Sequence, residues 1–191
     1  MAAMSEPVLA PRKRLLAAAD ELFYAEGVHS VGIERVLERA GVSKATLYKA
    51  YGSKEELVRA YLMGKHEFII EHLATARDGP APARDKILAV FDILGAMHAA
   101  PTFRGCPFVN ASAESPDDGS VAAVSTIHRD WVRALFEELA TEARLNDVPR
   151  LVNRLVLLYD GASVAAQLDR DQDAATTARE AAADLIEAAS R

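Results

Sequence analysis

The sequence predicts an all-α fold of about nine helices, with a small N-terminal head of three helices and a larger helical body. Apolar residues recur three and four positions apart in almost every segment, as on one face of a helix, and no stretch alternates with the period of a strand. Glycine, proline and serine stand at the breaks between these segments, where helices end and begin. The chain has 191 residues, half of them apolar, which is enough for one sizeable domain or for a small domain joined to a larger one.

The composition limits the kinds of site that the chain can carry. A single cysteine cannot form an internal disulfide, and no Cys/His cluster suggests a structural zinc, so we expect no metal and no cofactor. The N-terminus lacks the apolar core of a signal peptide and no apolar run could cross a bilayer, which predicts a cytoplasmic protein without membrane contact. The net charge of −6 is uneven: residues 1–65 carry ten Lys/Arg against eight Asp/Glu, and residues 66–191 carry twelve against twenty. A mildly basic head on an acidic body is compatible with DNA binding by the head alone.

The first two predicted helices lie within residues 11–40. The first runs from Pro11 to Glu26, because proline suits a first helical turn and Gly27 can end a helix. Residues 1–10 show no apolar period and are expected to form a loose arm. The second helix has one apolar face, formed by Ile33, Val36, Leu37 and Ala40.

A helix-turn-helix is predicted at the break after the second helix. Gly41 can take the left-handed backbone that ends a helix, and Val42 packs inward. Ser43 is placed to cap a third helix from Lys44 to about Ala50, by accepting hydrogen bonds from the amides two and three residues on. Two short helices joined by a tight glycine turn form a helix-turn-helix, whose second helix can enter the major groove of DNA.

Six further helices are expected to complete the fold. Ser53 and Glu56 form a capping box that starts the fourth helix, which extends to about Arg77 and connects the head to the body. The clearest break follows at 78–82. The remaining helices are expected at 83–99, at 107–114, around 124–139, from 147 to a turn at 169–173, and from there to the end, with loops at 100–106 and 115–119.

Between Gly27 and Leu57 the sequence resembles the tetracycline-repressor (TetR) family of bacterial transcriptional regulators. The similarity lies in three runs at fixed spacing: Ala40-Gly41-Val42-Ser43, Lys44-Ala45-Thr46-Leu47-Tyr48 and Ser53-Lys54-Glu55-Glu56-Leu57. Beyond these runs it rests on the number and order of the helices. The resemblance implies a homodimer whose two heads read a pseudo-palindromic operator in double-stranded DNA, and whose bodies each hold a pocket for a small-molecule effector. Residues 11–56 would be the DNA-binding domain, and residues 57–191 the effector-binding and dimerisation domain.

The residues that match the family's recognition helix are expected to contact DNA. Lysines neutralise phosphates, and Thr46 and Tyr48 can touch phosphates or thymine methyl groups. Lys54 matches the family's phosphate-contacting lysine, and Arg35 of the second helix is a further candidate. The predicted DNA-binding residues are Arg35, Ser43, Lys44, Ala45, Thr46, Tyr48, Lys49 and Lys54.

Three positions depart from the family pattern. Gly32 stands where a serine or threonine often caps the second helix, and it contributes no hydroxyl. Ala50 replaces a usually larger aromatic residue or histidine, which removes one contact to the DNA backbone. Tyr51 replaces a phenylalanine, so its ring is expected to point inward while its hydroxyl finds an exit or a partner.

The effector pocket is expected among aromatic and polar residues of the body, although an aromatic residue is more often part of the core. Asn110 and His128 could orient a ligand, or could be satisfied by hydrogen bonds within the protein. Cys106 lies near Arg104 and could be a redox-sensing thiol, but it has no second cysteine to pair with. The pocket candidates are Phe91, Met97, Phe103, Cys106, Phe108, Asn110, His128, Trp131 and Tyr159.

The last two helices are expected to form the dimer interface. The eighth helix is apolar on more than one face, and one further helix is too little to cover both faces. With the alanine-rich ninth helix, the eighth helix would build a four-helix bundle across a two-fold axis. The alternative is that the eighth helix is a core helix buried within one subunit. The interface candidates are Leu151, Leu155, Leu158, Ala162, Ala178, Ala182 and Leu185.

These features favour a ligand-responsive transcriptional regulator over two alternatives. We expect a repressor that binds a palindromic operator as a homodimer and is released when a small apolar or amphipathic molecule enters the body. An enzyme would need His128 with an acid such as Glu114 or Asp160, but no nucleophile–base spacing or phosphate loop accompanies them, and we predict no enzyme. A binding protein whose head no longer contacts DNA is supported only by Ala50.

Overall fold

The structure, a computed structural model, describes residues 10–115 and 119–190. Within these ranges it contains nine helices and no strand: α1 (Pro11–Glu26), α2 (Ile33–Ala40), α3 (Lys44–Tyr51), α4 (Lys54–Arg77), α5 (Ala83–His98), α6 (Pro107–Glu114), α7 (Gly119–Glu142), α8 (Val148–Leu168) and α9 (Ala174–Ala189). The predicted all-α fold and its helix order are confirmed. The predicted loop at 115–119 extends one residue too far, because Gly119 is already the first residue of α7. Residues 116–118 of this loop, and residues 1–9 of the arm predicted at 1–10, lie outside the described residues.

The ends of the head helices are formed by the capping residues that the sequence indicates. Gly41 has a φ of 61°, in the left-handed region, and the turn there returns two N–H groups to carbonyls of α2. The Ser43 hydroxyl accepts a hydrogen bond from the N–H of Thr46, at 3.3 Å, and the Ser53 hydroxyl caps α4 in the same way. These caps determine where α3 begins after α2 and where α4 begins after α3.

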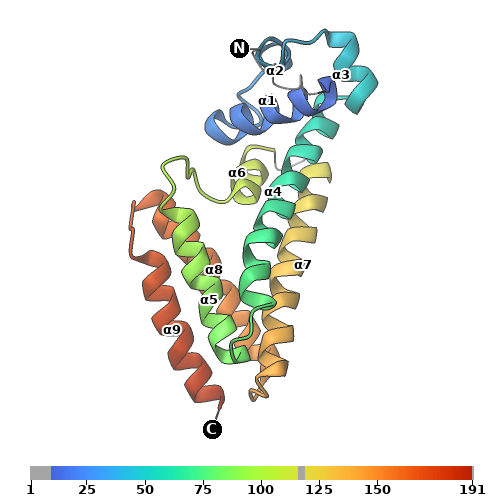
Figure 1. Cartoon of the computed structure of the whole chain (residues 1–191). Helices are drawn as coiled ribbons and strands as arrows, with labels where there is room; N and C mark the ends of the chain where they lie inside the picture. The colour runs from blue at the N-terminus through green and yellow to red at the C-terminus, as the bar shows by residue number, and fades with distance from the viewer. Residues whose placement is uncertain (1–9, 116–118, 191) are drawn as a thin grey trace, which may run out of the picture.

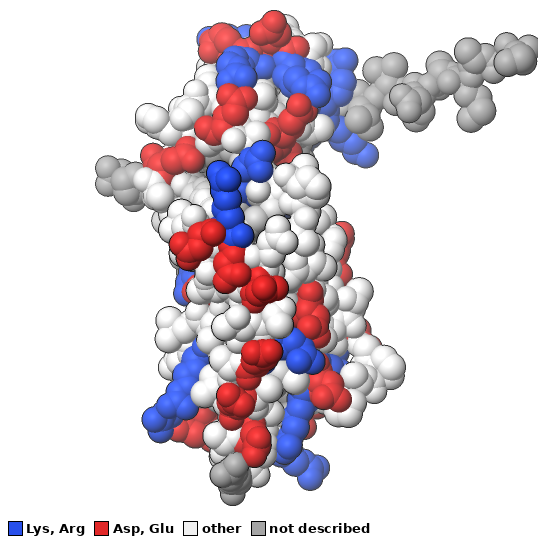
Figure 2. Space-filling model, turned by 90° about the vertical axis from the view of Figure 1, so that its left-hand side faces the viewer, with Lys and Arg blue, Asp and Glu red and all other residues white. Residues whose placement is uncertain are grey.

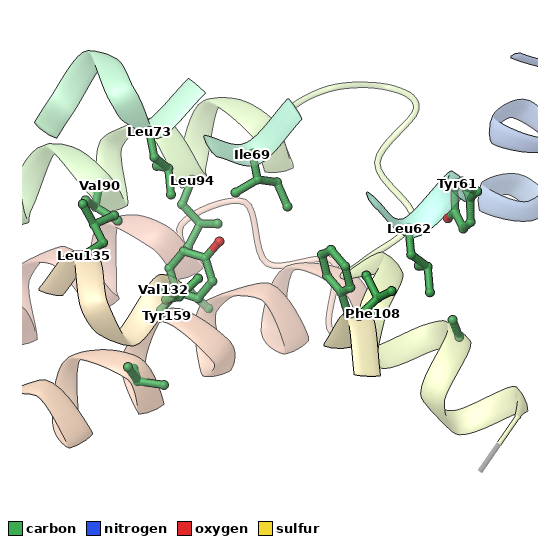
Figure 3. Close-up of a cluster of buried hydrophobic side chains, with 14 of the residues drawn as sticks. Tyr61, Leu62, Ile69, Leu73, Val90, Leu94, Phe108, Val132, Leu135 and Tyr159 are labelled. Atoms are coloured by element: carbon green, nitrogen blue, oxygen red, sulfur yellow. The ribbon is translucent and has the colours of Figure 1, made fainter. Parts of the chain in front are cut away.

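A continuous apolar core extends from the head into the body. Leu47 of α3 is fully buried, and α3 packs against α1, α2 and α4. The same cluster follows α4 into the body, where Phe91 stacks on Phe136 with ring centroids 5.9 Å apart. Figure 3 shows apolar side chains from several helices of this cluster. The predicted boundary between residues 56 and 57 falls within the first turn of α4, so this one helix belongs to both parts.

The body is a bundle with the head at one end (Figure 1). The helices α4 and α7 pack side by side, α8 packs between α7 and α9, and α5 packs on α4, α7 and α9. The short helix α6 lies between the head and the body and contacts α4 and α7. In the part of the chain that is described, no helix combines the length and the apolar character that a membrane span needs.

Candidate DNA-binding head and effector cavity

The helix α3 presents a polar face to solvent on the side opposite Leu47. Tyr48 is 52% exposed, and Thr46 is half-buried with its hydroxyl 2.9 Å from that of Ser43. Lys54, in the first turn of α4, is also half-buried. The predicted residues that are exposed on or next to α3 are Ser43, Lys44, Ala45, Tyr48 and Lys49. Two cations and a phenol on one face of a short helix are groups that can contact phosphates and base edges.

The predicted DNA contact of Arg35 would compete with an ion pair. Its guanidinium donates to both carboxylate oxygens of Glu26, at 2.6 and 2.9 Å, and thereby lowers the pKa of that carboxyl. Lys44 lies 3.4 Å from the Glu34 carboxylate, but both side chains are exposed and this pair is easily exchanged. Figure 2 shows Lys and Arg side chains of the head interleaved with Asp and Glu on the face in view.

Arg12 is a basic residue at the recognition helix that the sequence analysis did not select. Its guanidinium carbon lies 5.0 Å from the centre of the Tyr51 ring, and its carbonyl accepts a hydrogen bond from the Tyr51 hydroxyl at 3.0 Å. The partner expected for that hydroxyl is therefore found. Because Tyr51 ends α3, the first turn of α1 is held beside the recognition helix. The signal in the sequence was the run Arg12-Lys13-Arg14 directly after Pro11.

A cavity of about 1680 Å³ lies in the body. Its wall is formed by residues of α4, α5, α6, α7 and α8, and toward the head by α1 and the loop at residues 99–106. Six of the predicted pocket residues line it: Met97, Phe103, Cys106, Phe108, His128 and Tyr159. The structure therefore brings together most of the residues that the sequence analysis selected.

The other three predicted pocket residues do not line this cavity. Phe91 is fully buried in the core, where its ring packs on another aromatic ring, and Trp131 packs against the edge of the His66 ring, with centroids 6.1 Å apart. The amide of Asn110 donates to the Arg104 carbonyl at 2.9 Å and accepts from Gln167 at 3.1 Å. Asn110 thus ties the loop to α8 beside a smaller neighbouring cavity of about 350 Å³.

Several residues of the cavity wall were missed because nothing in the local sequence marks them. The ring of Tyr61 is 2% exposed, and His98 faces the cavity from the last turn of α5. Other missed polar residues of the wall are Asp20, Tyr24, Lys65, Arg129, Asp160, Ser163 and Gln167. They lie on long amphipathic helices, where the face that borders a cavity has the same spacing as the face that borders the core.

Two buried imidazoles join α4 to α7. The Nδ1 atoms of His66 and His128 are 3.3 Å apart, so the Nδ1–H of one ring donates a hydrogen bond to the Nδ1 of the other. The His128 ring also stacks on Phe108, with centroids 4.0 Å apart. Burial lowers the pKa of His66, and burial together with the nearby His66 and Arg129 lowers the pKa of His128 to about 3. Both rings are therefore neutral at neutral pH and act through hydrogen bonds and not through charge.

Acidification is expected to destabilise the fold through His128. The pKa of this group falls from an ordinary 6.5 to about 3 in the fold, so between these pH values the unfolded chain binds more protons. The free energy of unfolding therefore decreases as the pH falls below about 6.5, by about 2 kcal/mol at pH 5. Urea unfolding at pH 7 and pH 5 measures the loss. The variant His128→Gln should lose less stability between the two pH values, and an equal loss would contradict this assignment.

The environment of Cys106 does not favour a reactive thiolate. Burial raises the pKa of this thiol, whereas redox sensing needs a low pKa. The Arg104 guanidinium, which was expected to supply positive charge, instead donates to the Phe103 carbonyl at 3.0 Å. The described residues also bring no three His, Cys, Asp or Glu side chains together as a metal site would require.

Most of the predicted dimer-interface residues are buried in the core of their own chain, so they offer a partner little surface. These are Leu151, Leu155, Ala162, Ala178 and Ala182, while Leu158 and Leu185 are partly exposed. They are covered because α7 and α9 both pack on α8 and α5 packs on α9. The outer face of α8 carries a different apolar stripe, with Leu157 at 71%, Val164 at 42% and Leu168 at 72% exposure.

Comparison with known proteins gives matches along most of the chain. The family model for bacterial regulatory proteins of the tetR family matches residues 15–61, and the tetracyclin repressor-like C-terminal domain matches residues 83–182. The crystal structure of a TetR-family transcriptional regulator from Streptomyces coelicolor is 34% identical, has a TM-score of 0.88, and is aligned over 95% of this chain and 96% of that chain.

Curated relatives match over shorter stretches or at lower identity. The HTH-type transcriptional activator FasR of Mycolicibacterium smegmatis is 36% identical over 87 residues, which are 44% of this chain and 40% of FasR. The HTH-type transcriptional regulator LmrA of Bacillus subtilis is 22% identical over 153 residues, or 76% of this chain and 81% of LmrA. All three of these proteins are transcriptional regulators. With its helix-turn-helix at α2–α3 and both domain matches in place, the chain belongs to the TetR family of bacterial transcriptional regulators.

Proposed function

We propose that the protein is a dimeric repressor that binds a palindromic operator through residues 11–56 and is released by a small-molecule effector in the body. The observation that carries this proposal is a direct contact between the cavity wall and the head. The Tyr24 hydroxyl of α1 accepts a hydrogen bond from the Arg104 N–H and donates one to the Gly105 carbonyl, each at 3.0 Å. All three residues line the cavity. A ligand that displaces the loop at 99–106 therefore acts directly on α1.

A second contact supports the same route through α6. The carboxylate of Glu114, the last residue of α6, accepts a hydrogen bond from the His29 N–H at 2.9 Å. The carboxylate reaches this turn because Gly27 has no side chain, and a Cβ there would lie only 2.5 to 2.8 Å from it. The helix α6 begins at the cavity wall and ends on the turn after α1, so it adds a connection to the one through α4 that the sequence suggested.

Dimerisation is proposed through the outer faces of α8 and α9. Leu157, Val164 and Leu168 of α8 are spaced so that they share one exposed helical face. In α9, Leu185 is partly exposed. Two such faces would pack as a four-helix bundle. A dimer fits DNA only when its heads match half-sites about 34–36 Å apart or a multiple of this. If the dimer has two states that differ in the spacing of the heads, an effector shifts the equilibrium between them by as much as its affinity differs between the two.

Operator binding is expected to weaken steeply with salt. If Lys44, Lys49 and Lys54 each neutralise one phosphate per head, the dimer makes about six phosphate contacts, and log K should fall with log salt with a slope of about −5. Affinity would then drop about 1000-fold between 50 and 200 mM NaCl. Fluorescence anisotropy on DNA from the promoter beside the gene, with a scrambled duplex as control, measures this. Salt-independent binding, or no preference over the scrambled duplex, contradicts DNA recognition by the head.

Activation is a second candidate, favoured by the name of FasR, which is a transcriptional activator. Transcription in vitro from the bound promoter separates the two modes. Less transcript on adding the protein supports a repressor, and more transcript supports an activator.

A further inference from the structure

Tyr159 of α8 brings a hydroxyl without a partner to the cavity. The residue lines the cavity and is 7% exposed, and its ring packs edge-on against Phe136 with centroids 6.3 Å apart. Figure 3 shows the hydroxyl on the side of Leu94 and Ile69. No residue that the structure describes makes a hydrogen bond with this hydroxyl. Burial raises its pKa, so the phenol stays neutral and can donate its proton to an acceptor. The hydroxyl is open to the cavity, so an acceptor of a bound ligand can receive its hydrogen bond.

The charged groups inside the cavity wall already have partners. Lys65 lies 2.8 Å from the carboxylate of Asp20, and Arg129 lies 2.9 Å from that of Asp160. The other charged residues of the wall are exposed to solvent: Lys13, Glu21, Glu71 and Arg104. Arg129 is itself exposed, so its pair is easily exchanged. A charged ligand group placed deeper, among the apolar side chains of the wall, would lose its hydration without gaining a counter-charge, which is costly.

Two histidines of the wall, His98 and His128, are uncharged as well. His128 is held by its hydrogen bond to His66. The Ser163 hydroxyl donates to the Tyr159 carbonyl at 3.3 Å, so at its 3.2 Å contact with His98 it accepts a hydrogen bond from the Nε2–H. Burial lowers the pKa of His98 too. The uncharged polar groups of the wall are therefore these imidazoles together with several hydroxyls, among them the phenols of Tyr61 and Tyr159.

The rest of the wall is apolar, and the cavity is large. Ile69, Leu94, Phe108 and Val132 line it, and all four are buried side chains in the cluster of Figure 3. The volume of about 1680 Å³ exceeds the roughly 300–1,000 Å³ of most ligand pockets, so it accommodates a multi-ring or long-chain molecule. Such a ligand would gain affinity in proportion to the apolar surface that it buries.

We infer that the cavity binds an uncharged, mainly apolar molecule whose hydrogen-bond acceptor, such as a ketone or ester oxygen, is bound by the Tyr159 hydroxyl. This inference rests on the proposed role of the cavity as the effector site and adds the chemical class of the effector. Anions and cations of the same skeleton are rejected because the charged residues of the wall lie at its exposed or partly exposed parts and the apolar interior offers no counter-charge.

Four pyrene derivatives of similar size test the class: 1-acetylpyrene, 1-ethylpyrene, 1-pyrenecarboxylate and 1-pyrenemethylammonium. Their binding to the full chain, without DNA, is followed by their fluorescence. We expect the ketone to bind about 10-fold tighter than the ethyl compound, as one hydrogen bond implies, and about 100-fold tighter than either ion. An ion that binds as tightly as the ketone, or no binding by any of the four, overturns the inference.

The variant Tyr159→Phe tests the named residue. It should reduce ketone binding to the level of the ethyl compound, and unchanged binding of 1-ethylpyrene shows that the cavity remains folded. The matched variant Tyr61→Phe removes another hydroxyl from the same wall and should keep the preference for the ketone. The assignment is wrong if Tyr61→Phe loses the preference and Tyr159→Phe keeps it. Operator release is measured separately, so a protein that binds the ketone but stays on its operator contradicts only the proposed effector function.

Discussion

The variant Leu157→Glu with Val164→Glu is expected to be monomeric and to lose at least about 100-fold in operator affinity. Both residues lie on the outer face of α8, where their side chains are 71% and 42% exposed. Gly161 lies between them, with open space where a side chain would stand, and Leu168 continues the stripe. An exposed apolar stripe of this kind indicates a contact surface. Two carboxylates from each chain would meet like charges there and prevent the contact.

The loss of affinity follows from the small charge of a single head. Residues 1–65 carry ten Lys/Arg against eight Asp/Glu, so one head has little net attraction for DNA. In a dimer the second head binds at a high effective concentration, and that gain disappears in a monomer. Sedimentation equilibrium gives the mass, and anisotropy gives the affinity.

A control variant places one glutamate on another exposed apolar position. Ile127 of α7 is 44% exposed, and Ile127→Glu should stay dimeric and bind the operator as the parent does. Ile127→Glu should keep the unfolding midpoint of the parent, since its side chain is exposed. The double variant should remain folded, with an unfolding midpoint that no longer depends on the protein concentration. A monomeric double variant with parental operator affinity would show that the dimer is not needed for binding.

The helix ends could be predicted because their causes lie within a few residues. Gly41, Ser43 and Ser53 each complete a cap with neighbours in the chain, and the helices begin and end beside them. The family resemblance rests on these same residues, which explains why the head could be described in detail from the sequence. The run Arg12-Lys13-Arg14 was overlooked because its contact with Tyr51 joins residues far apart in the sequence.

The faces of the body helices could not be predicted, because they depend on which helices pack together. The helix α8 has two apolar stripes, and the sequence does not say that α7 and α9 cover Leu155 while Leu157 faces outward. A glutamate at Leu155 would therefore unfold the chain instead of separating a dimer. Phe91 and Tyr159 are likewise aromatic residues with helical spacing, but only Tyr159 borders the cavity. Whether an aromatic residue borders the cavity or the core depends on how the helices of the body are placed around it, which the spacing of residues within one helix does not reveal.

Replacing Tyr48 and Lys49 with alanine is expected to weaken operator binding at least about 100-fold, since each chain of the dimer loses a phosphate contact and a group able to contact base edges. Both side chains lie on the exposed face of α3, away from the buried Leu47, so the fold should be unaffected. The loss of Lys49 from both heads should also reduce the salt slope by about 2. Binding to operator and to scrambled DNA at several salt concentrations separates the two contributions: the lysine affects both duplexes, whereas Tyr48 affects the preference between them.

The control for this prediction is Arg84→Ala, which removes one exposed cation from the start of α5, at the end of the body away from the head (Figure 1). It changes the net charge of the chain by the same amount as the loss of Lys49. Because the Debye length is about 8 Å at physiological salt, a charge at that end of the body has little influence on DNA at the head. Arg84→Ala should therefore keep the affinity and the salt slope of the parent. If it weakened binding as much as the double variant, the effect would be one of net charge, and the assignment of DNA recognition to the exposed face of α3 would be wrong.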